Sequence, residues 1–155
     1  MVNGPVIEGM QTTEIKVGGS IPLESIVFAN KMHVPITGVE GNDIFTVNNP
    51  NPAAGLKSLS RESAKEEGEH NVFDVQAAAV PLTVLGGGRN TVNLGMGNLQ
   101  SITARVEVKD GNGLVALNVN DSADATGRTA SIATDGTTDT ISGLGPAEIT
   151  AEVLP

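Results

Sequence analysis

Short segments of alternating apolar and polar residues recur along the whole chain, and most of them end near Gly, Asn or Asp. A period of two residues is typical of β-strands that bury one face, and Gly, Asn and Asp commonly form the turns between strands. The pattern therefore predicts an all-β structure. The expected strands are residues 13–17, 25–28, 33–36, 44–47, 72–75, 80–84, 91–94, 103–108, 116–119, 129–132, 140–142 and 148–153.

The distances between these segments indicate a repeat. Ile36, Val84, Val108 and Ile132 each close an alternating segment, and they lie 48, 24 and 24 residues apart. A Gly-containing turn and a second alternating segment follow each of them. Two strands and a glycine corner per repeat are typical of a solenoid coil, whose apolar face is buried by the next coil. We therefore expect a short right-handed parallel β-helix of about four to five coils, with a β-sandwich as the alternative.

The composition agrees with thin, stacked layers. The chain has 155 residues, enough for one domain, and its 19 Gly and 8 Pro disfavour a helical bundle. Three Phe are its only aromatic residues, so the core has to be built from aliphatic side chains. We expect one domain over residues 1–155, with a cap or edge strands at 1–30 and repeat coils at 71–155. Aliphatic ladders and rows of Asn would hold successive coils together.

Residues 49–70 interrupt the repeat and hold the densest cluster of Lys, Arg and Glu in the chain. Ser60 is placed to cap a short helix that would run to Glu67, with Glu62 in its first turn. We interpret the range as a charged insertion. It would be either a solvated loop that replaces part of one coil or a protrusion that contacts a partner.

The charge of the chain excludes several classes of function. Nine Lys and Arg against eighteen Asp and Glu leave a net charge of -9. Because there is no basic patch, we expect no binding to nucleic acid or to an anionic membrane surface. The apolar runs are far shorter than the roughly 20 residues of a membrane-spanning helix. The absence of Cys excludes disulfides and thiolate chemistry.

The C-terminal half is similar to known repeat modules. ALNVNDSADATGRTASI at residues 116–132, followed by ISGLGPAEIT at 141–150, resembles modules of very large repetitive bacterial surface and extracellular proteins. The resemblance covers about residues 70–155, and such modules are expected to form parallel β-helices. It implies a secreted or cell-surface location and a structural role, with adhesion as the usual function.

Aspartates in the C-terminal part form a candidate calcium site. If coils stack at about 4.8 Å, Asp110 and Asp135 would lie in corresponding corners one coil apart, and Asp121 and Asp124 would share a loop. Carboxylates at that distance repel each other unless a cation bridges them, and calcium takes six or more oxygen ligands. The four aspartates are therefore candidate ligands of Ca²⁺. The alternative is that they form solvent-exposed turns.

Catalysis has little support in the sequence. The two histidines, His33 and His70, fall at a strand start and in the charged segment, and there is no Cys nucleophile and no G-x-S-x-G elbow. We therefore predict no catalytic residue and no enzyme. A carbohydrate-binding or carbohydrate-active β-helix domain, dependent on calcium, stays open as an alternative.

These observations predict a non-catalytic structural or adhesive module of an extracellular or cell-surface assembly. Its partners would be other protein subunits, further coils of the same protein, or a surface glycan. The other alternative is a self-assembling capsid, pilus or tail-type subunit on a β-sandwich. In that case the N-terminal 30 residues would pair with a neighbouring subunit by strand addition.

Overall fold

The described part of the chain contains β-strands joined by turns and loops and no helix, which confirms the all-β prediction. The computed structural model describes residues 1–16, 25–38, 41–62, 68, 70–110 and 114–153. No helix in these ranges is long and apolar enough to cross a membrane. The strands are β1 (Val2–Ile7), β2 (Met10–Lys16), β3 (Ser25–Phe28), β4 (His33–Thr37), β5 (Ile44–Asn49), β6 (Ser58–Glu62), β7 (His70–Ala78), β8 (Leu82–Gly86), β9 (Arg89–Leu94), β10 (Val106–Asp110), β11 (Leu114–Val119), β12 (Ser131–Thr134), β13 (Thr138–Ser142) and β14 (Ile149–Glu152).

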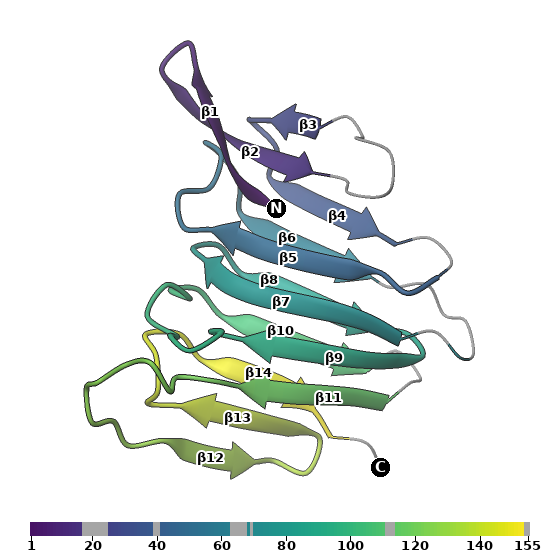
Figure 1. Ribbon diagram of the computed structural model, residues 1–155, viewed down its shortest axis with the longest axis vertical. Helices are drawn as coiled ribbons and strands as arrows, with labels where there is room; N and C mark the ends of the chain where they lie inside the picture. Colours follow the sequence, from purple (N-terminus) through teal and green to yellow (C-terminus); the bar gives the residue numbers. More distant parts are fainter. Residues whose placement is uncertain (17–24, 39–40, 63–67, 69, 111–113, 154–155) are drawn as a thin grey trace.

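The strands form two sheets of seven strands each. Sheet A has the order β11-β9-β7-β5-β1-β2-β3, and sheet B has the order β12-β13-β14-β10-β8-β6-β4. The two sheets lie one behind the other in Figure 1, with their strands running across the long axis of the molecule. Both sheets mix parallel and antiparallel pairs. This layout is sandwich-like and fits the alternative fold class predicted from the sequence.

From β4 to β11 the chain passes from one sheet to the other at every strand. The even-numbered strands β4, β6, β8 and β10 are neighbours in sheet B, and every pair among them is parallel. The odd-numbered strands β5, β7, β9 and β11 are neighbours in sheet A and are parallel as well. Each of these strands therefore lies beside the strand that comes two places later in the sequence.

The 24-residue spacing corresponds to neighbouring positions in sheet B. Val108 of β10 lies opposite Val84 of β8 in parallel register, and both side chains are buried. Arg61 of β6 lies opposite Val84 on one side and opposite Ile36 of β4 on the other. The interval of 48 residues between Ile36 and Val84 therefore contains one further strand, with Arg61 at the equivalent position.

The fourth member of the spacing, Ile132, is not equivalent to the other three. Ile132 lies in β12, pairs with Ile141 in an antiparallel hairpin, and is 72% exposed. β14 lies on the side of β10 opposite β8, and it places Ala151 opposite Val108. The physical reason is the short turn between β12 and β13, where Asp135 and Gly136 reverse the chain and favour a hairpin over a parallel crossover.

The predicted helix start at Ser60 is wrong. Ser60 lies in β6, between Pro35 of β4 and Thr83 of β8. Its neighbours Leu59 and Arg61 are 2% and 7% exposed, so the residues of this strand alternate between the interior and the surface. Burial with a period of two favours a strand over the helix that local capping signals indicate. Residues 63–67, where the helix would continue, lie outside the described residues.

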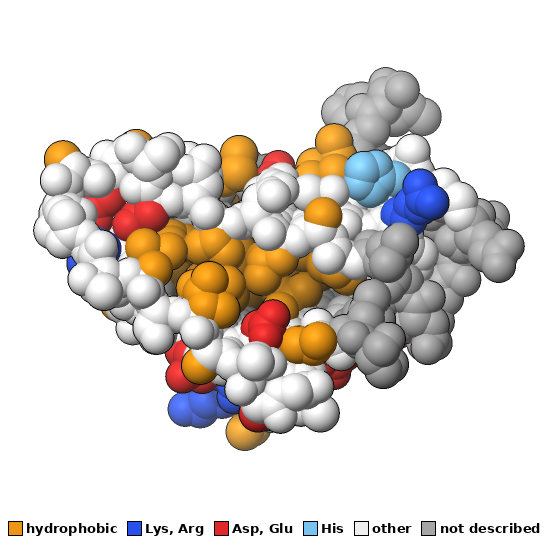
Figure 2. Space-filling model, turned by 90° about the horizontal axis from the view of Figure 1, so that it is seen from below, with side chains coloured by type: hydrophobic (Ala, Val, Ile, Leu, Met, Phe, Trp, Pro, Cys, Tyr) orange, Lys and Arg blue, Asp and Glu red, His pale blue; other side chains and the backbone are white. Residues whose placement is uncertain are grey.

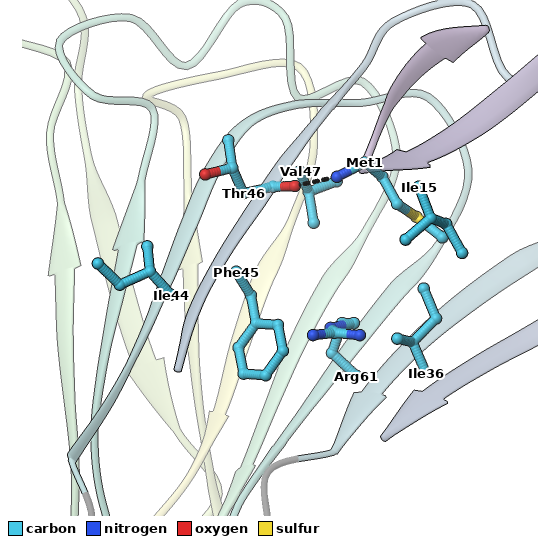
Figure 3. Close-up of a pocket in the computed structure, with 8 residues that line it drawn as sticks. All are labelled: Met1, Ile15, Ile36, Ile44, Phe45, Thr46, Val47 and Arg61. Atoms are coloured by element: carbon cyan, nitrogen blue, oxygen red, sulfur yellow. Dashed lines mark hydrogen bonds between the residues drawn. The ribbon is translucent and has the colours of Figure 1, made fainter. Parts of the chain in front are cut away.

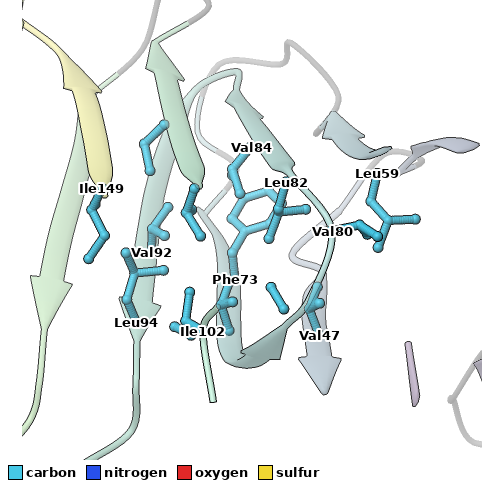
Figure 4. Close-up of a cluster of buried hydrophobic side chains, with 14 of the residues drawn as sticks. Val47, Leu59, Phe73, Val80, Leu82, Val84, Val92, Leu94, Ile102 and Ile149 are labelled. Carbon is cyan, nitrogen blue, oxygen red and sulfur yellow. The ribbon is translucent and has the colours of Figure 1, made fainter. Parts of the chain in front are cut away.

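The hydrophobic core lies between the two sheets. Figure 4 shows side chains from both sheets pointing toward one another, with Phe73 of β7 among aliphatic residues. The fully buried members include Val75, Leu82, Val92 and Val106. Mostly aliphatic residues thus fill the thin layer between two sheets, as the shortage of aromatic residues predicts.

Buried asparagines lie where the strands of sheet A begin. Asn71 of β7 lies opposite Asn90 of β9, and the two are 1% and 2% exposed. Oδ1 of Asn71 accepts a hydrogen bond of 2.7 Å from the backbone N–H of Asp43, and Nδ2 of Asn90 donates one of 2.8 Å to the carbonyl of Gly87. These bonds satisfy backbone groups at the corners, where the ladder between strands ends.

The two sheets extend past each other at opposite ends of the molecule. Among the described strands, sheet A continues beyond β5 with β1, β2 and β3, whereas sheet B ends at β4. Beyond β10, sheet B continues with β14, β13 and β12, whereas sheet A ends at β11. The additional strands β1–β3 and β12–β14 are joined by antiparallel pairs. The parallel central part is therefore flanked by an antiparallel group at each end, as Figure 1 shows.

Candidate functional site

Two of the predicted calcium ligands lie together and share a cation from the protein itself. Asp121 and Asp124 follow β11, and Nε of Arg128 lies 2.8 Å from Oδ2 of Asp124 and 3.9 Å from Oδ2 of Asp121. Oδ1 of Asp121 also accepts a hydrogen bond of 2.8 Å from the backbone N–H of Leu99. Arg128 thus supplies a positive charge at the place where the sequence analysis expects a metal ion.

Hydrogen bonds hold Asp124 in its ionised form. The backbone N–H of Thr126 donates to Oδ1 of Asp124 at 2.8 Å, and Arg128 donates to Oδ2. Together these donors lower the pKa of Asp124 below its ordinary value of 3.8, and the Thr126 N–H is the larger cause. The carboxylate and the loop that contains Arg128 are therefore fixed relative to each other.

Asp135 is a turn residue. Its Oδ1 accepts hydrogen bonds from the backbone N–H and the hydroxyl of Thr137 and from the backbone N–H of Thr138, at 2.8, 2.8 and 2.7 Å. These bonds lower the pKa of Asp135. They close the turn between β12 and β13, which is the use of aspartate that the alternative interpretation expects.

Asp110 and Asp135 do not lie in corresponding corners one coil apart. Asp110 ends β10 and lies opposite Gly86 of β8, while Asp135 follows β12, and both β14 and β13 separate β10 from β12. In the described part of the chain no group of three or more His, Asp or Glu residues could hold a metal ion. The side chain of Asp110 lies outside the described residues. The assignment of the four aspartates to calcium stays a prediction.

The two histidines link neighbouring strands at the surface. Nδ1 of His33 lies 2.7 Å from Oγ of Ser58, which joins β4 to β6, and Nε2 of His70 lies 2.9 Å from Oγ1 of Thr91, which joins β7 to β9. The first pair belongs to sheet B and the second to sheet A. The two histidines therefore do not form a common site.

The end of the molecule at β11 has an incompletely covered apolar surface. Val115, Leu117 and Val119 of β11 pack against the core but are only partly buried, whereas the residues opposite the last two, Val92 and Leu94 of β9, are fully buried. Figure 2 looks onto this end and shows hydrophobic side chains gathered in the hollow between the two sheets. In the described part of the chain no strand pairs with the outer edge of β11. We refer to Val115, Leu117, Val119 and the edge of β11 as the open end.

Comparisons with known proteins do not extend this description. No protein-family model, curated protein or solved structure matches the chain.

A small cavity with a buried arginine lies between the sheets, near β1 and β5. The cavity has a volume of about 60 Å³ and is lined by Met1, Ile15, Ile36, Ile44, Phe45, Thr46, Val47 and Arg61. Figure 3 shows the Arg61 side chain, which comes from β6 of sheet B, pointing toward Phe45 of β5 in sheet A. The N-terminal amine of Met1 donates a hydrogen bond to the carbonyl of Thr46, at the wall of the cavity.

The aromatic residues beside this cavity form a stack. The guanidinium carbon of Arg61 lies 3.5 Å from the centre of the Phe45 ring, and the rings of Phe45 and Phe73 stack with centres 4.9 Å apart. A cation over an aromatic face is attracted by the negative face of the ring. The attraction to the Phe45 ring therefore helps to stabilise the positive charge of Arg61, which is only 7% exposed.

The local sequence does not predict that Arg61 lines an interior cavity. The residue belongs to the charged range 49–70, where arginine is expected at the surface. Two signals could have identified it. Arg61 alternates with Leu59 as an inward-facing residue would, and it lies about halfway between Ile36 and Val84.

Proposed function

We propose that this protein is a non-catalytic structural module that joins a neighbouring β-structure at its open end. The observation that carries the proposal is the edge of β11, which has no partner strand in the described part of the chain and whose apolar row is only partly covered. An unpaired edge presents a row of N–H and C=O groups that can accept another strand. A strand added there would also cover Val115, Leu117 and Val119.

The proposal includes the finer fold predicted from the sequence, a short solenoid. The chain path from β4 to β11 supports it, because the chain alternates between the sheets and every strand is parallel to the strand two places later. Solenoid modules bury their apolar faces by stacking on further repeats. We infer that the partner at the open end is another subunit or further coils of the same protein.

A secreted or cell-surface location and an adhesive role are part of the proposal. Their support is the resemblance of residues 70–155 to repeat modules of bacterial surface proteins.

The alternative of a capsid, pilus or tail-type subunit assigns the joining surface to residues 1–30. It requires the N-terminal strands to pair with a neighbouring subunit. Within this chain β1 pairs with β2 and β5, and β2 pairs with β3. Among the described strands, β3 is the edge at that end of sheet A, so strand addition by a neighbour would have to occur there.

The test is association measured by sedimentation velocity over a wide range of protein concentrations. The wild-type protein is expected to form dimers or longer assemblies as the concentration rises. Leu117→Lys places a charge in the apolar row of the open end and is expected to abolish association, because inward-pointing charges block edge-to-edge contact.

Ile44→Lys is the matched control. Ile44 is 74% exposed, begins β5, and is separated from β11 by β7 and β9, so this variant should associate like the wild type. Circular dichroism melts establish that both variants are folded. Association that Leu117→Lys and Ile44→Lys weaken equally would contradict the open end as the joining surface. A wild-type protein that stays monomeric at all concentrations would exclude another copy of this chain as the partner and leave further coils of the same protein.

A further inference from the structure

Arg61 is a buried cation at the wall of a cavity, and the fold as described gives it no anionic contact. It is 7% exposed, and its guanidinium lies over the Phe45 ring. In the described ranges of the chain no carboxylate lies within 4.0 Å of the guanidinium and no hydrogen bond involves it. Asp43, which precedes β5, acts on it as a countercharge. A buried charge without a close partner is costly, so a compensating group is expected beside it.

In the described part of the chain, the side-chain donors of Arg61 make no hydrogen bond, and its guanidinium lies over the Phe45 ring. A guanidinium that stacks on a ring keeps its five N–H groups in the plane of the group, directed away from the ring. Burial lowers the pKa of Arg61 to about 10, and Asp43 partly opposes this effect. Arg61 therefore remains a cation at neutral pH, with hydrogen-bond donors next to an open space.

We propose that the cavity beside Arg61 binds a small monovalent anion of the size of chloride. Its volume of about 60 Å³ has room for one such ion with a water molecule and excludes large organic anions. The remaining walls are mostly apolar, from Ile15, Ile36 and Val47, and the amine of Met1 at the wall donates its hydrogen bond to the carbonyl of Thr46. The guanidinium therefore supplies the charge that selects the ligand. The anion would hold Arg61 of sheet B against the strands of sheet A.

This inference is independent of the proposed joining function. The cavity lies beside β1 and β5, whereas the open end is at β11, on the other side of β7 and β9 in sheet A. A variant that loses the anion therefore need not lose association.

Thermal unfolding in different sodium salts tests the proposal. Chloride replaces gluconate stepwise at constant ionic strength and neutral pH, and formate and bromide form parallel series. Gluconate is too large for the cavity. The wild-type Tm is expected to rise by about 3–6 °C and to saturate, because a ligand that binds only the folded state stabilises it. Formate and bromide are expected to act like chloride.

Two arginine variants separate the site from a general effect of salt. Arg61→Met removes the buried cation and should abolish the rise, while Arg89→Met removes an exposed arginine at the start of β9 and should leave the rise unchanged. An equal rise in Arg61→Met and the wild type would overturn the proposal. So would a wild-type Tm that is the same in chloride and gluconate.

Chloride NMR of the wild type keeps the test valid if Arg61→Met does not fold. Line broadening of ³⁵Cl by the protein, relieved by bromide but not by gluconate, supports a specific site. Broadening no greater than that of free chloride, or equal relief by both competitors, overturns it.

Discussion

Asn118 of β11 donates a hydrogen bond of 2.9 Å from its side-chain amide to the side-chain oxygen of Asn93 in β9. Asn93 in turn donates one of 2.8 Å to the carboxylate of Asp74 in β7. The three residues lie opposite one another in parallel strands, and we refer to them as the polar ladder. It connects three successive strands of sheet A by side chains alone.

The ladder predicts graded losses of stability. Asn93→Ala breaks both bonds and should lower the free energy of unfolding by about 1–2 kcal/mol, since a side-chain hydrogen bond contributes roughly 0.5–1.5 kcal/mol. Asn118→Ala breaks one bond at an exposed end and should cost about 0.5 kcal/mol. Urea unfolding of both variants measures the difference. A loss for Asn118→Ala as large as that for Asn93→Ala would show that the bonds do not act as a ladder.

Gly95 is required by its backbone and by its neighbours. Its φ is +87°, and a Cβ there would lie 2.5 Å from the carbonyl oxygen of Asn120 and 2.7 Å from Cδ2 of Leu99. Gly136 has a similar φ of +91° but open space around it. Gly136→Ala should therefore cost only the left-handed strain of about 1–2 kcal/mol. Gly95→Ala should cost at least about 3 kcal/mol, because overpacking adds to the strain.

Chemical denaturation of the two glycine variants at one temperature gives both values. Equal losses would mean that the chain around Gly95 moves aside without cost.

Val108 and Ile132 should respond differently to truncation although the 24-residue spacing treats them alike. Val108 is 3% exposed in the core, so Val108→Ala should cost about 2 kcal/mol from lost burial and a residual cavity. Ile132 is 72% exposed, and Ile132→Ala should change stability by less than about 0.5 kcal/mol. Thermal or urea unfolding distinguishes them. A large loss of stability in Ile132→Ala would show that Ile132 is buried in the core, as the continuous 24-residue repeat requires.

Asp124 should titrate below its ordinary pKa of 3.8 and stabilise the folded state at neutral pH. Its pKa is lowered on folding, so this contribution is complete above 3.8 and is lost as the pH falls from 3.8 through the lower folded value. Arg128→Met should raise the pKa of Asp124 only part of the way, because the N–H of Thr126 is the larger cause and remains. Carboxyl NMR titration of both proteins measures the two values. A full return to 3.8 in Arg128→Met would show that Arg128 dominates.

The period of two determined most of the strands, because alternation records which side chains face the core. The spacing between Val84 and Val108 likewise predicted their opposition in sheet B. The calcium site was harder to predict, because the positions of aspartates in the sequence do not show which side chains lie next to each carboxylate. In the structure, Nε of Arg128, four residues after Asp124, lies 2.8 Å from the carboxylate of Asp124.

Only the tertiary structure decided which strands lie beside each other, because an alternating pattern does not specify the neighbours of a strand. An alternating segment can pair with a parallel strand or form an antiparallel hairpin. Ile132 therefore follows the repeat in sequence but lies in an antiparallel pair with Ile141. The local sequence around Arg61 predicts a charged residue at the surface. Its place between the sheets depends on Phe45, because only the folded chain brings that ring over the guanidinium and leaves a cavity beside it.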